Sequence, residues 1–123
     1  MGIANKYLLM VFALSLFNTG CCQCDLNNIT IGTQRTGQLI KNMNEWSVRV
    51  INSCASSCSY SNLMLSCKGF HTVEAIDPTV FKKQGDKCLV NNGRALVPKS
   101  SVQFSYAWDP PFIMFANSSN ISC

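Results

Sequence analysis

Residues 102–108 read VQFSYAW and show the clearest periodicity in the chain. Large side chains occupy every second position, and small or polar ones lie between them: Val102, Phe104, Tyr106 and Trp108 against Gln103, Ser105 and Ala107. A period of two residues is that of a β-strand with one buried face, whereas a helix repeats every three or four residues. The stretch therefore predicts a strand that is covered on one side by a core.

The same alternation recurs along the chain. It is found in three further segments: residues 28–34 (NITIGTQ), 45–52 (EWSVRVIN) and 62–67 (NLMLSC). Residues 112–116 (FIMFA) are apolar at every position, which predicts a strand covered on both faces. Short strands at this density predict an all-β protein, an antiparallel β-sandwich of six or seven strands.

Turn-forming residues separate these runs. They are Thr36-Gly37, Asp77-Pro78, Gln84-Gly85-Asp86, Asn91-Asn92-Gly93 and Asp109-Pro110-Pro111. The asparagine-rich turn at residues 91–93 lies between two apolar runs and predicts a hairpin over residues 88–97. Residues 77–83 predict one short helix or 3₁₀ turn, with Asp77 as its cap and Pro78 in its first turn.

Eight cysteines in 123 residues indicate an oxidising compartment, and the N-terminus agrees. Lys6 precedes an uncharged run of eleven residues, 7–17, which is too short to cross a bilayer but typical of a signal peptide. Cleavage is expected after Gly20 or after Cys22, and we prefer Cys22, which makes residues 1–22 the signal peptide and residues 23–123 a single secreted domain without a membrane anchor.

Cleavage after Cys22 leaves six cysteines, an even number that predicts three disulfides: Cys24, Cys54, Cys58, Cys67, Cys88 and Cys123. Six cysteines allow 15 pairings, so the connectivity stays open. A Cys54–Cys58 bridge is plausible only if residues 55–57 form a loop. If Cys21 or Cys22 is retained, the framework becomes odd or eight-membered and permits a covalent dimer.

The charge is low and scattered. The net charge of +4 falls to +3 without Lys6, which does not indicate nucleic acid as a partner. Lys82, Lys83 and Lys87 form the single basic cluster, and it is either a solvated loop or an aid to docking on an acidic surface.

No pattern predicts an enzyme, a cofactor or a metal. Paired cysteines leave no thiolate nucleophile, and the sole histidine, His71, has no ligand partners at metal-site spacing. No G-x-S-x-G elbow or phosphate-binding loop occurs. Glu74 and Asp77 are the nearest carboxylate pair in sequence, but Asp77 precedes a proline and is better explained as a cap.

Three N-glycosylation sequons are present, at Asn28, Asn117 and Asn120. The large aromatics Trp46, Tyr106 and Trp108 have two interpretations, as sandwich core or as interface anchors. Both interpretations apply to residues 106–112. Two prolines stiffen this loop, which carries Trp108 and Phe112, and a stiff loop loses less entropy on binding.

The order of several motifs resembles the plant tapetum determinant-like family of small secreted cysteine-rich proteins. The resemblance covers residues 24–116 and rests on motifs in this order: Cys24-Asp25-Leu26, Thr36-Gly37, EWSV at 45–48, Cys54 and Cys58, CKGF at 67–70, IDP at 76–78, CLVN at 88–91 and FSYAW at 104–108. It implies that the six cysteines named above form the family's six-cysteine framework.

The resemblance also implies a function. We expect a secreted, apoplastic ligand of a leucine-rich-repeat receptor kinase, acting in cell-fate specification of reproductive tissue such as the anther and its tapetum. Our candidate contact residues for the receptor ectodomain are Trp108, Phe112, Lys82 and Lys83. The alternative is a non-catalytic carbohydrate-binding or wall-associated module, which requires an exposed row of aromatics.

Overall fold

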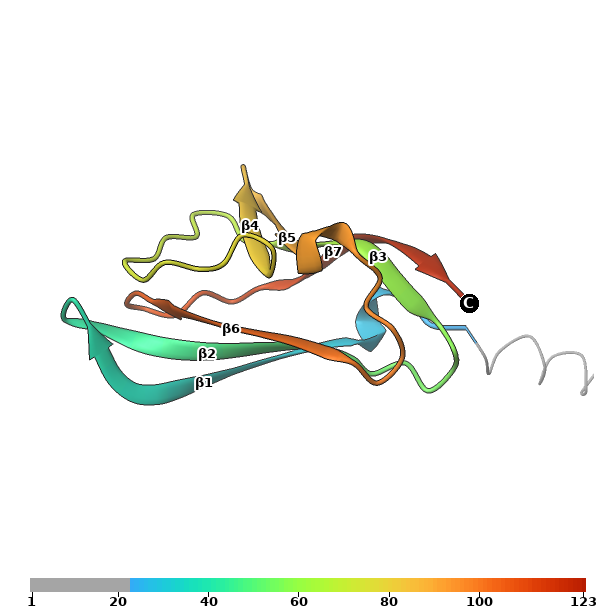
Figure 1. Ribbon diagram of the computed structural model, residues 1–123, viewed down its shortest axis with the longest axis horizontal. Helices are drawn as coiled ribbons and strands as arrows, with labels where there is room; N and C mark the ends of the chain where they lie inside the picture. The colour runs from blue at the N-terminus through green and yellow to red at the C-terminus, as the bar shows by residue number, and fades with distance from the viewer. Residues whose placement is uncertain (1–22) are drawn as a thin grey trace, which may run out of the picture.

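A computed structural model of the chain describes residues 23–123, so the predicted signal peptide, with Cys21 and Cys22, lies outside the described residues. Seven strands form two sheets that pack face to face (Figure 1). One sheet has the order β1-β2-β6 and the other β4-β5-β3-β7. The bounds are β1 Ile29–Ile40, β2 Met43–Asn52, β3 Ser59–Ser66, β4 Phe81–Gln84, β5 Lys87–Val90, β6 Ser101–Ala107 and β7 Phe115–Ser122.

Every strand pair is antiparallel, which confirms the predicted sandwich. The remaining elements of residues 23–123 are two short 3₁₀ helices, η1 (Leu26–Asn28) and η2 (Asn91–Gly93). No helix in this part of the chain has the length and apolarity needed to cross a bilayer.

The core lies between the inner faces of the two sheets. Val48 and Val50 of β2 and Phe104 and Tyr106 of β6 are buried there, as the alternation predicts. Ala107 is also buried, although the alternation places it on the outer face. The reason is a neighbouring loop, whose Val73 N–H donates to the Ala107 carbonyl at 3.0 Å.

Strand β1 is longer than predicted because it pairs with β2 beyond the Thr36-Gly37 turn signal. Gly37 has a φ of +89° and lies where the register shifts between Arg35 and Leu39, so this signal marks a bulge inside the strand. The hairpin turn falls later, at Lys41-Asn42, where both residues have positive φ as a two-residue hairpin turn requires.

The predicted hairpin over residues 88–97 is wrong. Residues 91–93 form η2, and Leu96 then pairs with Tyr60 of β3, with N–O distances of 2.8 and 3.1 Å. Strand β5 lies between β4 and β3 in its sheet, so both of its edges are already paired and the segment after η2 cannot bond to it.

Of the short helix or 3₁₀ turn predicted over residues 77–83, the cap and one turn are present, with the Val80 N–H donating to the Asp77 carbonyl at 2.9 Å, but residues 81–83 are not helical. Asp77 Oδ1 accepts from the Thr79 N–H at 2.9 Å and closes a single turn. The chain then becomes strand β4, because Phe81 is buried and its ring stacks on that of Phe104 with centroids 4.1 Å apart. Tertiary packing overrides the local helical signal.

Residues 112–116 are not a fully covered strand. Met114 is buried, but Ile113 is 90% and Phe115 59% exposed. Strand β7 begins only at Phe115 and lies at the edge of its sheet. A segment along the side of a sandwich turns alternate side chains to solvent, which explains the exposed residues.

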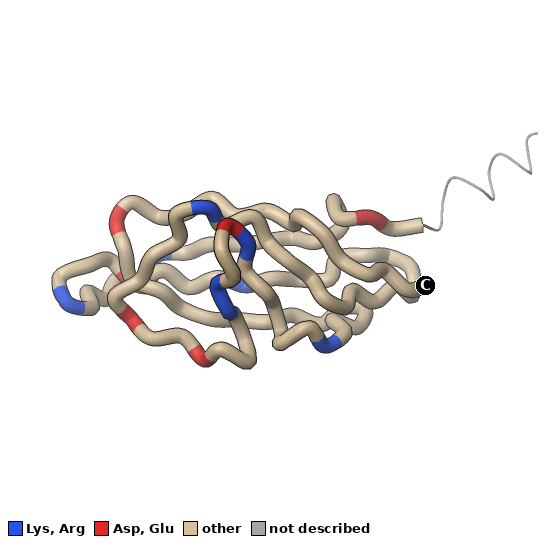
Figure 2. Tube along the Cα trace, turned by 90° about the horizontal axis from the view of Figure 1, so that it is seen from above, with Lys and Arg blue, Asp and Glu red and all other residues tan. Residues whose placement is uncertain are grey.

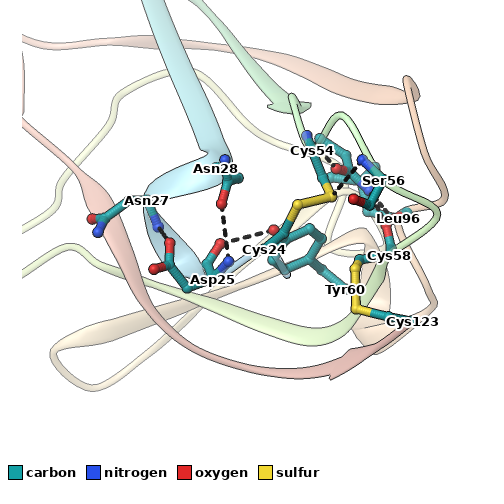
Figure 3. Close-up of a disulfide and its surroundings, with 11 residues drawn as sticks. Cys24, Asp25, Asn27, Asn28, Cys54, Ser56, Cys58, Tyr60, Leu96 and Cys123 are labelled. Atoms are coloured by element: carbon teal, nitrogen blue, oxygen red, sulfur yellow. Dashed lines mark hydrogen bonds between the residues drawn. A yellow bond between two sulfur atoms is a disulfide. The ribbon is translucent and has the colours of Figure 1, made fainter. Parts of the chain in front are cut away.

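The six predicted cysteines form three disulfides, Cys24–Cys54, Cys58–Cys123 and Cys67–Cys88. The plausible Cys54–Cys58 bridge is not formed. The β2–β3 loop instead carries one partner for each end of the domain, Cys54 for Cys24 and Cys58 for Cys123 (Figure 3). We call these two bridges the terminal clasp.

Candidate functional site

Among the described residues, the loop after β3 forms a surface hollow next to a cluster of aromatic side chains around Phe70. The Phe70 ring is buried and contacts the rings of Phe81, Tyr106 and Phe112, with centroids 5.2–5.3 Å away. The next residue, His71, is exposed, and its ring lies edge-on to Trp108 at 4.4 Å. We call this arrangement the Phe70 corner.

A hollow of about 480 Å³ opens at the Phe70 corner. Its lining residues come from one loop and from β4: Phe70, His71, Thr72, Val73, Glu74, Ala75, Ile76, Phe81 and Lys83. Aromatic and aliphatic side chains therefore lie beside a carboxyl, an imidazole and an ammonium group. An apolar hollow with a few polar groups is the usual form of a binding site.

Hydrogen bonds fix the loop against the end of β6. The Thr72 hydroxyl accepts from the Ala107 N–H at 3.0 Å and from the Glu74 N–H at 3.1 Å, and it donates to the Glu74 carbonyl at 2.9 Å. On the β4 side, Lys83 Nζ donates to the Phe70 carbonyl at 2.9 Å. The hollow is thus formed before any partner binds.

A pair of carboxyl groups lies under this loop. Glu45 of β2 is buried and accepts a hydrogen bond from the Thr36 hydroxyl at 2.8 Å. Glu74 Oε1 is buried beside it with no fixed donor among residues 23–123. Burial, followed by the hydrogen bond and charge of Glu45, raises the pKa of Glu74 to about 7. Glu74 therefore keeps its proton at mildly acidic pH, where an ordinary glutamate is ionised.

We expect this pair to make the stability of the domain depend on pH. Glu74 binds its proton more tightly in the folded chain than at the ordinary glutamate value of 4.5, so its contribution is complete below about pH 4.5 and is lost as the pH rises through about 7. Glu74→Gln keeps the neutral donor at every pH. Melting temperatures measured from pH 4.5 to pH 8 should coincide at the acidic end and favour the variant at the basic end. Parallel curves would show that Glu74 does not titrate in this range.

The carboxyl pair differs from that of a glycosidase. Glu74 lies close enough to Glu45 for that carboxyl to raise its pKa, whereas glycosidases hold their carboxyls roughly 5 Å or more apart across a sugar. His71 faces Trp108. The arrangement can fix the loop and offer a surface for binding.

The structure brings three of the four predicted contact residues to the Phe70 corner. Trp108 and Phe112 are half-buried and Lys83 bonds to the Phe70 carbonyl, while Lys82 is exposed on the same strand as Lys83. Phe112 packs on Phe70 and its N–H donates to the Tyr106 hydroxyl at 2.8 Å, so it supports the corner from within. Sequence reasoning missed Glu45, Thr72 and the position of His71.

The aromatics do not form a row on the surface. Tyr106 is fully buried, which confirms its interpretation as core. Trp46 and Trp108 are half-buried against the core, and the Trp46 indole donates to the Trp108 carbonyl at 2.9 Å. This placement counts against a sugar-stacking platform.

The sequons occupy different environments. Asn117 and Asn120 are exposed on β7. Asn28 is half-buried, and its Oδ1 accepts from the Asp25 N–H at 2.9 Å in a capping box of η1.

The sulfurs of Cys24, Cys54 and Cys58 lie within 4.8 Å of one another, but each is part of a disulfide of the terminal clasp. A disulfide sulfur is not a thiolate, which is the form that binds metal.

The fold and the Phe70 corner define a disulfide-linked β-sandwich of the kind that presents a rigid binding surface. A family model described as "Tapetum determinant 1, C-terminal" matches residues 25–123. The chain belongs to this family, which confirms the resemblance drawn from its motifs.

Named relatives agree. The chain is 34% identical over 85 residues to TPD1 protein homolog 1 of Arabidopsis thaliana, covering 68% of this chain and 48% of the relative. It is 32% identical over 100 residues to TPD1 protein homolog 1A of Oryza sativa subsp. japonica, covering 76% and 43%. The chain thus spans about half the length of these relatives. No solved structure matches it.

Proposed function

We propose that the chain is a secreted plant signalling protein that binds the ectodomain of a leucine-rich-repeat receptor kinase and acts in cell-fate specification of anther or tapetum type. The observation that carries the proposal is the family match over residues 25–123. Three disulfides support an extracellular, apoplastic location, because such bridges form and persist in oxidising compartments. The protein acts by binding and not by catalysis.

The Phe70 corner is the proposed receptor-binding surface. Charged residues are sparse along the chain (Figure 2), so a few cations can dominate a local field. Lys82 is exposed on β4 and His71 lines the hollow, while Trp108 offers an aromatic edge beside His71. The hydrogen bonds of Thr72 and Lys83 hold this surface in one conformation, which lowers the entropy lost on binding.

We expect His71→Ala to weaken binding to the cognate ectodomain by roughly tenfold, since it removes a contact at the preformed hollow. Lys82→Glu should weaken it by a similar factor, since it reverses an exposed charge on β4, the strand that also carries Lys83 of the hollow. Calorimetric titration of the oxidised, secreted chain against candidate ectodomains measures this. The matched control is Arg49→Glu, which makes the same charge reversal on the outer face of the other sheet. Absence of binding at tens of micromolar across the candidate receptors would contradict the proposed function. Equal losses for all three variants would contradict the assignment of the surface.

A further inference from the structure

Three of the four sheet edges carry a feature that obstructs pairing with another strand. The last residue of β6, Ala107, is hydrogen-bonded through its N–H to the Thr72 hydroxyl and through its carbonyl to the Val73 N–H. Strand β4 has only four residues, two of them lysines. Strand β7 has register shifts along its pairing with β3 and contains two sequons. Short edges, lysines and irregular ladders are the means by which proteins protect sheet edges.

The edge of β1 is neither short nor irregular along residues 29–35, and its sequon, at Asn28, lies just before the strand. These residues pair in regular register with β2, from Ile29 opposite Asn52 to Arg35 opposite Trp46. Among residues 23–123, no backbone hydrogen bond outside this ladder reaches residues 30–35. The stretch contains no lysine and no proline. It presents free N–H and C=O groups that could bond to one more strand.

Two hollows lie beside this edge. One, of about 280 Å³, is bounded by Ile29, Ile31 and Met114, among others. The other, of about 300 Å³, is bounded by Ile31, Thr33 and Ile113. The hollows are therefore offset by two residues along β1, which is the spacing of side chains on one face of a strand. Ile29, Ile31 and Thr33 lie opposite Asn52, Val50 and Val48, so this is the core-facing side.

The next core-facing position along β1 is Arg35. Its guanidinium donates to Asn44 Oδ1 at 2.7 Å and forms no ion pair with a carboxylate among residues 23–123. No acidic residue occurs between Leu26 and Asn44. A second copy of β1 would therefore bring no carboxylate to Arg35, whereas a strand from another protein could do so.

We propose that the free edge of β1 binds an extended segment of a protein partner by β-strand addition. All strand pairs of the sandwich are antiparallel, and antiparallel ladders are slightly the more stable, so the added strand runs antiparallel to β1. It then meets Arg35 first and the two hollows afterwards. The segment accordingly reads acidic-x-apolar-x-apolar from its N-terminus.

This surface is centred on β1, whereas the Phe70 corner is hydrogen-bonded to β6 at the opposite edge of the sheet. Phe112 lies between the two surfaces, since it packs on Phe70 and also lines the hollow at Ile31 and Ile113. The inference goes beyond the proposed function and adds a second docking surface. One partner on each side would let the domain join two proteins.

The test uses a fluorescein-labelled synthetic peptide with the core Glu-Thr-Val-Thr-Val and the oxidised, secreted chain, with binding followed by anisotropy. Two N-methylated forms are compared, one methylated at the Glu and Val amides and the other at the Thr amides. Backbone amides of alternate residues point to opposite edges of a strand, so one form alone should bind roughly tenfold more weakly. Equal affinities of the two forms, or no binding of the parent peptide below about 1 mM, would overturn the proposal.

Protein variants test the hollows and the charge. Ile113→Ser should weaken peptide binding at least roughly threefold, while Val97→Ser, also an exposed apolar residue, should not. Arg35→Glu should favour the peptide in which lysine replaces glutamate. Both Ile113→Ser and Arg35→Glu should leave receptor binding unchanged, so the two proposals fail separately. A dimer in sedimentation velocity that Ile113→Ser dissociates would assign the edge to a second copy and overturn the choice of partner.

Discussion

Replacing Asn52 by alanine is expected to destabilise the domain by about 3 to 5 kcal/mol. Asn52 ends β2 on the core-facing side and is only 1% exposed. Its Nδ2 donates to the carbonyls of Cys58 and Leu96 at 2.8 and 3.0 Å, and its Oδ1 accepts from the Cys54 N–H at 3.0 Å. Alanine would leave two buried backbone groups, the Cys58 carbonyl and the Cys54 N–H, without partners, while the Leu96 carbonyl keeps only its bond from the Tyr60 N–H. Each unsatisfied group costs roughly 1 to 3 kcal/mol.

Urea denaturation of the oxidised chain measures this loss. The matched control is Asn117→Ala, which removes the same side chain from an exposed position of β7 and should change the free energy of unfolding by less than about 0.5 kcal/mol. A loss below about 1 kcal/mol for Asn52→Ala would mean that water replaces the amide and that the network does not position the β2–β3 loop.

Asn52 also shows how far the sequence predicts the fold. Strands β2, β3 and β6 follow from their alternation because one face of each packs on the core, and burial of one face produces that pattern. Asn52 itself continues the core-facing series of Val48 and Val50. A polar residue at such a position is a readable signal of a buried hydrogen-bond network, although the sequence does not name its partners.

The two predictions from the sequence that were wrong wholly or in part, at residues 88–97 and 77–83, placed the turns correctly but not the strands that follow them. Residues 91–93 do turn the chain, but the run that follows bonds to β3 and not back to β5. Likewise, Asp77 does cap a turn, yet the Phe81 contact with Phe104 makes the next segment a strand. Local residues determine whether the chain turns. Which strand the following segment pairs with depends on which sheet edges are unpaired and which side chains fit the core.

The candidate site was predictable only in part for the same reason. Trp108 and Phe112 stood out as aromatics on a proline-stiffened loop, and Lys83 as part of a basic cluster. Their meeting place, Phe70, is brought to them by β3, the Cys67–Cys88 bridge and the bonds to Ala107. Glu45 and Glu74 come together by the same docking, and no spacing in the sequence indicates it.

Loss of the Cys58–Cys123 bridge in a Cys58→Ala, Cys123→Ala variant is expected to destabilise the domain by about 4 kcal/mol. The bridge joins residues 65 positions apart, and the entropy that a cross-link removes from the unfolded chain grows with the logarithm of loop length. For a domain of this size, the melting temperature should fall by roughly 15 to 30 °C. Scanning calorimetry of the secreted variant measures it.

The Cys67→Ala, Cys88→Ala variant separates loop entropy from local packing. Its bridge spans 21 positions, for which the same relation gives about 3 kcal/mol, so loop length alone makes it the milder loss. Packing predicts the opposite order, because Cys67 and Cys88 are both buried whereas Cys123 is exposed at the end of the chain. If the Cys67–Cys88 variant melts at the lower temperature, contacts in the folded core outweigh the constraint on the unfolded chain. If it melts at the higher temperature, the terminal clasp stabilises the sandwich mainly by tying the C-terminus to the β2–β3 loop.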